Sequence, residues 1–326
     1  MTPPVAVLSV SFRTPPALWR GVQSTLRGGV LALLLAMLAL PVAAETKRIG
    51  PKLFDAKELL VVDVIGSIEI TVGEGPKIEV VLEGEPRLLE DLSLRGNGDT
   101  LVIAREKDWL DFPERQLYPW RDVYPSVTLR LPAGTPVTLD GVIGEARIGD
   151  IAAPLAMEVS LLDAKVGDVS EAALKLHGRG DIALGKVAGR LSILSSGSSE
   201  VTVGDVGDAE IKKSGSGDIA LGVVARGLSY DSAGSGDTKV AAVNGPVEVL
   251  INGSGGLRIG GGEASPLRLR LNGSGDFRLE GTAVNPDVTI NGSGSVRVQT
   301  HRGTLRLRSF SGAVTYDEQG GIAITQ

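Results

Sequence analysis

The chain has 326 residues, with 44 glycines, 4% aromatic residues and no cysteine. This length allows one or two domains with a hydrophobic core. The absence of cysteine excludes disulfides, thiolate metal sites, a cysteine nucleophile and a lipidated N-terminal cysteine. The net charge is −6, and it becomes −9 without the three arginines of the leader described next, because 30 basic and 39 acidic residues remain. This balance argues against nucleic-acid binding.

Residues 1–44 are interpreted as a signal peptide. Three arginines, Arg13, Arg20 and Arg27, precede an apolar run of 11 residues at 30–40, and small residues at 42–44 fit a cleavage site before Glu45. The apolar run is short for a transmembrane helix, although an uncleaved anchor is the alternative. We therefore predict an exported protein without a transmembrane segment after cleavage. Its expected location is the periplasm, the outer cell surface or the medium.

Residues 45–135 form a β-rich N-terminal part with strands expected at 68–72, 77–84, 100–106 and 126–131. We expect these strands to start or cap the solenoid that follows. Between them, the segment 107–125 has a different composition and contains five aromatic residues: Trp109, Phe112, Tyr118, Trp120 and Tyr124. Exposed aromatic rings stack on sugars or anchor a protein partner. The alternative, which we favour, is a cap over one end or flank of the solenoid.

Residues 136–326 contain a repeat of 18–20 residues. A glycine-rich turn such as "NGSGDFRL" (272–279) returns with its second glycine position at these residues: Gly144, Leu162, Gly180, Ser199, Gly217, Gly236, Gly255, Gly275, Gly294 and Gly312. The second and fourth positions after this slot are apolar and the third is polar or small, which is the alternation of a strand with one buried face. A second strand often precedes the turn. Repetition at this period is typical of a solenoid, so each repeat is predicted to be one coil of a parallel β-helix.

The glycines are most simply corner residues, because glycine reaches positive φ without steric cost. Asn252, Asn272 and Asn291 share one turn position, so their side chains are expected to form a hydrogen-bonded ladder. Five aspartates follow the slot: Asp163, Asp181, Asp218, Asp237 and Asp276. They raise the alternative of Ca²⁺ binding, but one intermittent carboxylate per coil supplies few ligands, and an aspartate that bonds nearby backbone amides is the simpler interpretation.

No catalytic constellation or cofactor motif is found. The glycine turns are followed by strands and not by a helix N-terminus, and the sequence contains no Gly-Lys-Ser/Thr after them. Both observations argue against a phosphate-binding loop. The two histidines, His177 and His301, do not belong to a recognisable set with outward carboxylates. We therefore predict a protein that is not an enzyme, with no catalytic, cofactor or metal residues. A lyase or hydrolase acting on envelope polysaccharide remains the alternative.

The outward position three residues after the slot is cationic in four successive coils, at Lys239, Arg258, Arg278 and Arg297. Strand stacking would place these side chains about 4.8 Å apart. One interpretation is that the long side chains splay, shield the strands and meet acids such as Glu280. The functional hypothesis is that this basic stripe binds an anionic polymer, because arginine suits bidentate contact with carboxylate or phosphate.

Several segments together resemble the head GIN domain family, the putative auto-transporter adhesin domain of bacteria: the turn repeat, "LLVVDVIGSIEITVGEG" (59–75), "LLEDLSLRGNGDTLVIARE" (88–106) and "VTLRLPAGTPVTLDG" (127–141). The resemblance implies a right-handed parallel β-helix, an exported bacterial protein and no established enzymatic activity. The sequence thus predicts an adhesion, binding or scaffold protein of the envelope, with a polysaccharide or a protein as its partner.

Overall fold

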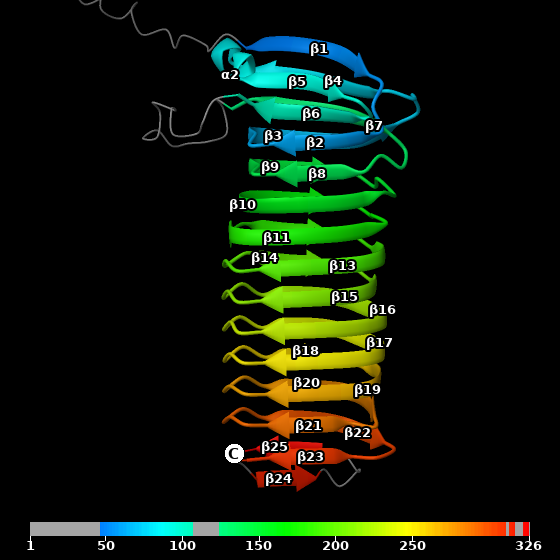
Figure 1. Cartoon of the computed structure of the whole chain (residues 1–326), viewed down its shortest axis with the longest axis vertical. Coiled ribbons are helices and arrows are strands. Elements are labelled where there is room, and N and C mark those ends of the chain that lie inside the picture. Colours follow the sequence, from blue (N-terminus) through cyan, green and yellow to red (C-terminus); the bar gives the residue numbers. More distant parts are fainter. Residues whose placement is uncertain (1–45, 107–123, 311–312, 317–321, 326) are drawn as a thin grey trace, which may run out of the picture. The chain divides into compact units, whose positions relative to one another are not determined.

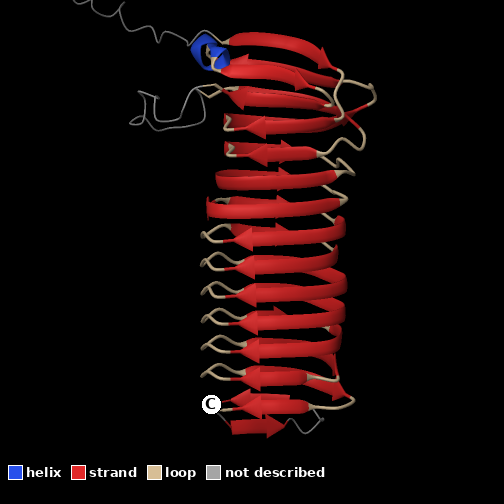
Figure 2. Cartoon of the chain, in the orientation of Figure 1, coloured by secondary structure: helices blue, strands red, loops and turns tan. Residues whose placement is uncertain are grey.

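The structure is a computed structural model that describes residues 46–106, 124–310, 313–316 and 322–325. The predicted signal peptide and four of the five aromatic residues, Trp109, Phe112, Tyr118 and Trp120, lie outside the described residues. The contacts divide the chain into residues 1–43 and 44–326, and the fold below is that of the second unit. Its described part is almost entirely β-structure, with one short helix, α2 (Pro86–Glu90) (Figure 2). None of the described helical residues forms a helix long and apolar enough to cross a membrane.

The central part of this unit is a parallel β-helix. Successive strands lie side by side at the 18–20-residue period of the sequence (Figure 1). The strands of this part are β8 (Val137–Asp140), β9 (Ile143–Ile148), β10 (Pro154–Val166), β11 (Glu171–Arg179), β12 (Asp181–Leu184), β13 (Val187–Ser195), β14 (Glu200–Val203), β15 (Val206–Lys213), β16 (Ile219–Ser232), β17 (Thr238–Ile251), β18 (Leu257–Ile259), β19 (Gly262–Leu271), β20 (Phe277–Val284), β21 (Asp287–Ile290), β22 (Val296–Arg302) and β23 (Arg306–Ser309). All pairings between them are parallel, which confirms the predicted fold class.

Each coil has three short stretches of sheet, as the pairing of β16 with β17 shows. The first stretch follows the glycine-rich turn (219–221 on 238–240), the second follows the next corner (223–224 on 242–243), and the third leads into the next turn (228–232 on 247–251). The predicted pattern of strand, glycine turn and strand is therefore confirmed. The remaining part of each coil is also partly stranded.

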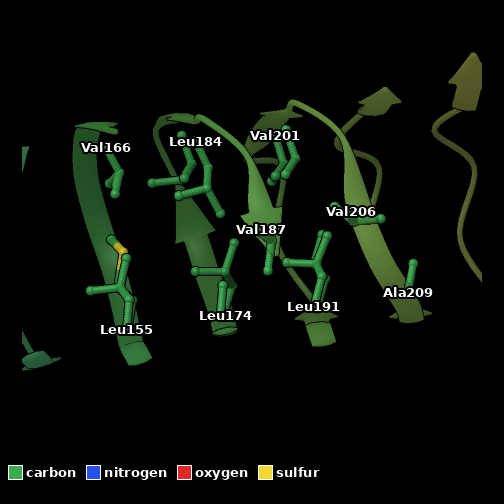
Figure 3. Close-up of a cluster of buried hydrophobic side chains, with 14 of the residues drawn as sticks. Leu155, Val166, Leu174, Leu184, Val187, Leu191, Val201, Val206 and Ala209 are labelled. Carbon is green, nitrogen blue, oxygen red and sulfur yellow. The ribbon is translucent and has the colours of Figure 1, made fainter. Parts of the chain in front are cut away.

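The core lies inside the coils and is built from the alternating apolar positions. The pairs predicted to point inward, such as Ile182 with Leu184 and Phe277 with Leu279, are at most 5% exposed. Side chains from successive strands pack on one another in this interior, as Leu155, Leu174 and Leu191 illustrate (Figure 3). Because every coil buries its apolar residues against the coils before and after it, the repeat is stabilised by its neighbours.

The N-terminal part both extends and caps the β-helix. β2 (Glu58–Val62) pairs in parallel with β6 (Thr100–Arg105) on one side and β8 on the other, and β3 (Ile65–Gly73) pairs likewise with β7 (Ser126–Pro132) and β9. The coil formed by β2 and β3 thus lies between two coils that come later in the sequence. Three antiparallel pairings close this end. They involve β1 (Lys47–Phe54), β4 (Ile78–Gly84) and β5 (Leu92–Asn97), which pair with β4, β7 and β6 respectively.

The last repeat departs from the prediction of ten coils. The strand after the tenth slot, β24 (Ala313–Tyr316), pairs antiparallel with β25 (Ile322–Thr325), and β25 pairs antiparallel with β22. The sequence pattern of this last copy therefore does not stack as a parallel strand. An antiparallel strand instead covers the edge of β22, which limits uncontrolled pairing with other chains.

The glycines of the turns are needed for close stacking more than for backbone conformation. Among the slot residues, positive φ is found at Gly144 and Gly180, but not from Gly217 to Gly294. A Cβ at Gly234, however, would collide with the carbonyl oxygen of Gly215 in the preceding turn, and the other glycines of this column meet the same obstacle. The prediction of corner glycines holds, but the reason based on positive φ is wrong for most of them.

Side-chain ladders join the turns of successive coils. The Asn272 side chain donates a hydrogen bond of 2.8 Å to the Asn252 side-chain oxygen, and Asn291 donates one of 2.9 Å to Asn272, which confirms the predicted asparagine ladder. Four of the five aspartates after the slot accept a backbone amide from the next coil, as Asp218 does from Asp237 at 2.8 Å. The simpler interpretation is therefore confirmed for Asp163, Asp218, Asp237 and Asp276, but not for Asp181.

Candidate functional site

The four cations of the predicted stripe occupy one row on the outer surface. Lys239 on β17 pairs in register with Arg258 on β18, Arg258 with Arg278 on β20, and Arg278 with Arg297 on β22. All four side chains are exposed. The residues on either side of each cation are buried in the core, so the alternation of the strand forces the cation outward. The backbone thus holds four positive charges in a straight row on a rigid sheet.

One carboxylate lies inside this row. Glu280 accepts a hydrogen bond from the guanidinium group of Arg258 at 2.7 Å and forms an ion pair with that of Arg278 at 2.8 Å. The predicted contact of the stripe with Glu280 is therefore confirmed, and it joins the two central arginines. Within the described structure, Lys239 and Arg297 make no ion pair, so the row carries four positive charges and a single negative one.

A second group of cations lies on the other side of the glycine-rich turn. Arg268 and Arg270 are exposed on β19, and Arg306 and Arg308 are exposed on β23. Arg308 makes a long ion pair of 3.9 Å with Asp287. The stretch 238–310 has nine basic and five acidic residues, whereas 45–237 has 21 basic and 32 acidic ones. The basic stripe therefore belongs to a basic group of coils in an otherwise acidic chain.

The remaining candidates from the sequence do not come together as one site. Tyr124 is half-buried beside the first coils, far along the sequence from the basic stripe, and the rest of the aromatic set lies outside the described residues. His177 contacts Glu158 at 3.5 Å and Ser196 at 3.3 Å. Lys175, and to a smaller extent His177, holds the pKa of Glu158 below its ordinary value. Within the described ranges, no three His, Asp or Glu side chains are grouped so as to hold a metal ion.

A buried polar cluster in the core was missed by the sequence analysis. Lys213 is only 2% exposed, and its ammonium group donates hydrogen bonds to the backbone carbonyls of Gly236 and Asp237. Ser195 and Ser232 occupy the same inward position in the coils before and after it. Burial lowers the pKa of Lys213, although the carboxylates of Asp218 and Asp237 oppose this effect. The sequence does show that this position faces the core, because the equivalent positions of other coils hold apolar residues such as Leu176 and Ile251.

Comparison with known proteins gives a family and a set of distant structural likenesses. One crystal structure, of a putative lipid binding protein from Parabacteroides distasonis, has a TM-score of 0.39 and 17% identity, and the match covers 79% of this chain and 96% of that one. A putative adhesin from Bacteroides fragilis has a TM-score of 0.30 and 13% identity, with 82% and 96% covered. A putative adhesin from Parabacteroides merdae has a TM-score of 0.31 and 16% identity, with the same coverage.

No curated protein matches the chain. The family described as "putative auto-transporter adhesin, head GIN domain" matches residues 61–262 and 244–302, which is most of the sequence and includes the whole basic stripe. The segments that carried the resemblance in the sequence lie largely within these matches. The chain therefore belongs to the head GIN domain family of putative auto-transporter adhesins.

Proposed function

We propose that the protein is an exported, non-catalytic binding protein of the bacterial envelope that contacts anionic polymers through the basic stripe. The polymer would be an acidic polysaccharide or the phosphate-bearing part of lipopolysaccharide. The observation that carries this proposal is the in-register row of Lys239, Arg258, Arg278 and Arg297, which holds a single carboxylate and lies in the basic coils of an acidic chain. Membership of an adhesin family supports a binding role.

The geometry suits a linear polymer better than a small anion. The row repeats at the strand spacing of about 4.8 Å, so an extended chain with regularly placed carboxylates or phosphates would meet one cation after another. Neighbouring cations at this spacing repel one another by only about 1 kcal/mol in water. The row is therefore tolerated without a ligand, and an anion that lies along it removes the repulsion. Guanidinium groups add bidentate hydrogen bonds to carboxylate or phosphate.

The test is binding of the purified protein to polygalacturonate and to lipopolysaccharide at low and at moderate salt. The variant R258S/R278S/R297S is expected to lose about 2 kcal/mol of binding free energy, or roughly thirtyfold in affinity. The matched control is K165S/K186S/R190S, which removes the same charge from exposed positions in earlier coils. Its affinity should stay close to that of the wild type.

Three results would overturn the proposal. The wild type does not bind, its affinity changes neither with salt nor with the triple substitution, or the two triple variants lose equal amounts of affinity. Release of new reducing ends or unsaturated products from the polysaccharide would indicate a carbohydrate-active enzyme instead. Fractionation of a tagged protein tests the location, which the proposal places in the periplasm or at the outer cell surface.

A further inference from the structure

A groove crosses the surface of the first coils, and none of its lining residues belongs to a coil of the basic stripe. It has a volume of about 910 Å³, which is within the range of roughly 300–1,000 Å³ common for small-molecule sites. Tyr124 lies at one end and Ser198 at the other. Between them the groove runs over the corners at Gly66, Gly144 and Gly180. The groove is thus a feature of the coils formed by β3, β9, β10, β11 and β12.

The groove exists because the corners of β9 and β10 are shorter than the later ones. From β14 to β22, a loop stands out at the corner of each coil, whereas the corners at β9 and β10 carry no such loop (Figures 1 and 2). In β10 the strand continues through this corner without interruption, from Pro154 to Val166. The longer corner at the end of β11, together with the loop that contains Ser198, therefore forms a step, and the shorter corners before it form the floor.

The two walls of the groove differ in chemistry. One wall is a row of apolar side chains, Ile65, Ile143 and Leu161, which pair in register on successive coils. Leu161 is 49% exposed, and it is one of only five large apolar side chains that are clearly exposed in the described structure. This wall ends in Arg179, the partner of Leu161 on the next coil.

The opposite wall is a row of carboxylates. Glu145 pairs with Asp163, and Asp163 accepts the backbone amide of Asp181 at 3.1 Å. Arg147 lies beside this row and is bonded to Glu145 at 3.3 Å. In the structure as described, Asp181 and Arg179 have no side-chain partner. The groove therefore offers hydrogen-bond acceptors and donors along one side and apolar surface along the other, with charges of both signs.

We propose that this groove binds a short, uncharged oligosaccharide. A pyranose ring has an apolar face formed by C–H groups and a rim of hydroxyls, and the two walls match these two aspects. Ile143, Leu161 and Tyr124 provide the surface for the ring faces. Asp163 and Asp181 accept hydrogen bonds from hydroxyl groups, and Arg179 donates to them. The groove holds three carboxylates and two guanidinium groups, so its charge is nearly balanced and a strongly charged ligand is not favoured.

This site goes beyond the proposed function and does not depend on the basic stripe. The test uses isothermal titration of the full mature chain with neutral hexasaccharides of glucose, mannose and xylose. The variant L161S/D181N removes an exposed apolar group and one acceptor without touching the core, and at least about a tenfold loss of affinity is expected. The control L194S/D231N makes the same changes at outward positions of other coils, where Leu194 is 42% exposed, and it should bind as the wild type does.

The variant R258S/R278S/R297S should also keep its affinity for the neutral hexasaccharide, which separates this site from the basic stripe. The proposal is overturned if none of the three hexasaccharides binds, or if L161S/D181N binds as tightly as the control. It is also overturned if a basic peptide such as oligolysine occupies the groove, with binding lost in L161S/D181N, while the hexasaccharides do not bind. In that case the row of carboxylates binds a basic polypeptide.

Discussion

Lys213 provides a direct test of the packing inside the β-helix, because it places an ammonium group in an apolar core. The side chain is 2% exposed and donates to the backbone carbonyls of Gly236 and Asp237. Replacement by methionine keeps most of the buried stem and removes the charge. Replacement by alanine also removes three heavy atoms of the stem, at about 0.8 kcal/mol for each methylene-sized group, and leaves a cavity. K213A should therefore be less stable than K213M by about 2–4 kcal/mol.

The pH dependence has a defined sign. Burial lowers the pKa of Lys213 in the folded protein from its ordinary value of 10.5, so the folded state loses its proton at a lower pH than the unfolded state. Between these two pKa values the unfolded chain binds more protons, and the stability of the wild type relative to K213M must rise with pH. The full slope is about 1.4 kcal/mol per pH unit. Below the lowered pKa the difference between the two proteins should be constant.

The assay is urea unfolding followed by far-UV circular dichroism, for the wild type, K213M and K213A at a series of pH values from neutral to 10.5. Subtracting K213M from the wild type removes the contributions of the other titrating groups. A difference that stays flat, or that falls with pH, would refute the buried charge. Equal stabilities of K213A and K213M would refute the close packing of the Lys213 stem.

Three further predictions concern the turns and one surface ion pair. Gly234→Ala should destabilise the protein by more than about 2 kcal/mol in urea unfolding, because its Cβ would collide with the Gly215 carbonyl; Gly75→Ala, where nothing lies within 4 Å, should be close to neutral. Asn272→Ala breaks both bonds of the asparagine ladder and should lower stability by about 1–2 kcal/mol, whereas the same change at the exposed Asn244 should have little effect; equal losses would contradict the ladder. Lys175→Met removes the main cause of the lowered pKa of Glu158, so NMR titration of the Glu158 carboxyl should show that pKa returning toward 4.5; an unchanged titration would show that another group sets it.

The repeat made most of the β-helix predictable from sequence. Each turn is followed by apolar residues at the second and fourth positions, and this alternation assigns the inward face, so the outward position of Arg258 and its neighbours follows from counting. The stacking of the stripe and its contact with Glu280 could be predicted for the same reason. A fixed period places equivalent residues beside one another without any knowledge of distant contacts.

The N-terminal part was less predictable because it has no such period. The strands β3, β4, β6 and β7 were expected close to where they occur, but the alternation of one strand does not tell which other strand pairs with it. The β2–β3 coil lies between two later coils because β2 and β3 pair with strands that are distant in the sequence, β6 and β7 on one side and β8 and β9 on the other. The antiparallel pairing of β24 was missed for a related reason. Its pattern continues the repeat, but β25 occupies the edge of β22 on which a further parallel strand would stack.

The groove on the first coils also escaped prediction, although its cause is visible in the sequence. The corner at Leu162 is one residue shorter than the corner at Gly180 and the later ones, which shifts the register between β10 and β11. Lys213 was missed because neighbouring lysines at 212 and 213 suggest a solvated pair, whereas strand alternation requires one of them to face the core.

The most direct measurement of the central claim, that the basic stripe binds an anionic polymer, is the affinity of Glu280→Gln for polygalacturonate. Glu280 forms ion pairs with both central arginines, so it competes with the ligand for Arg258 and Arg278. Removing its charge should tighten binding by roughly 1 kcal/mol, or about fivefold, at low salt. Glu263→Gln changes the net charge equally but frees Arg302, which lies outside the stripe, and it should change the affinity less. Unchanged or weaker binding of the Glu280→Gln protein, or an equal gain in both variants, would contradict the account.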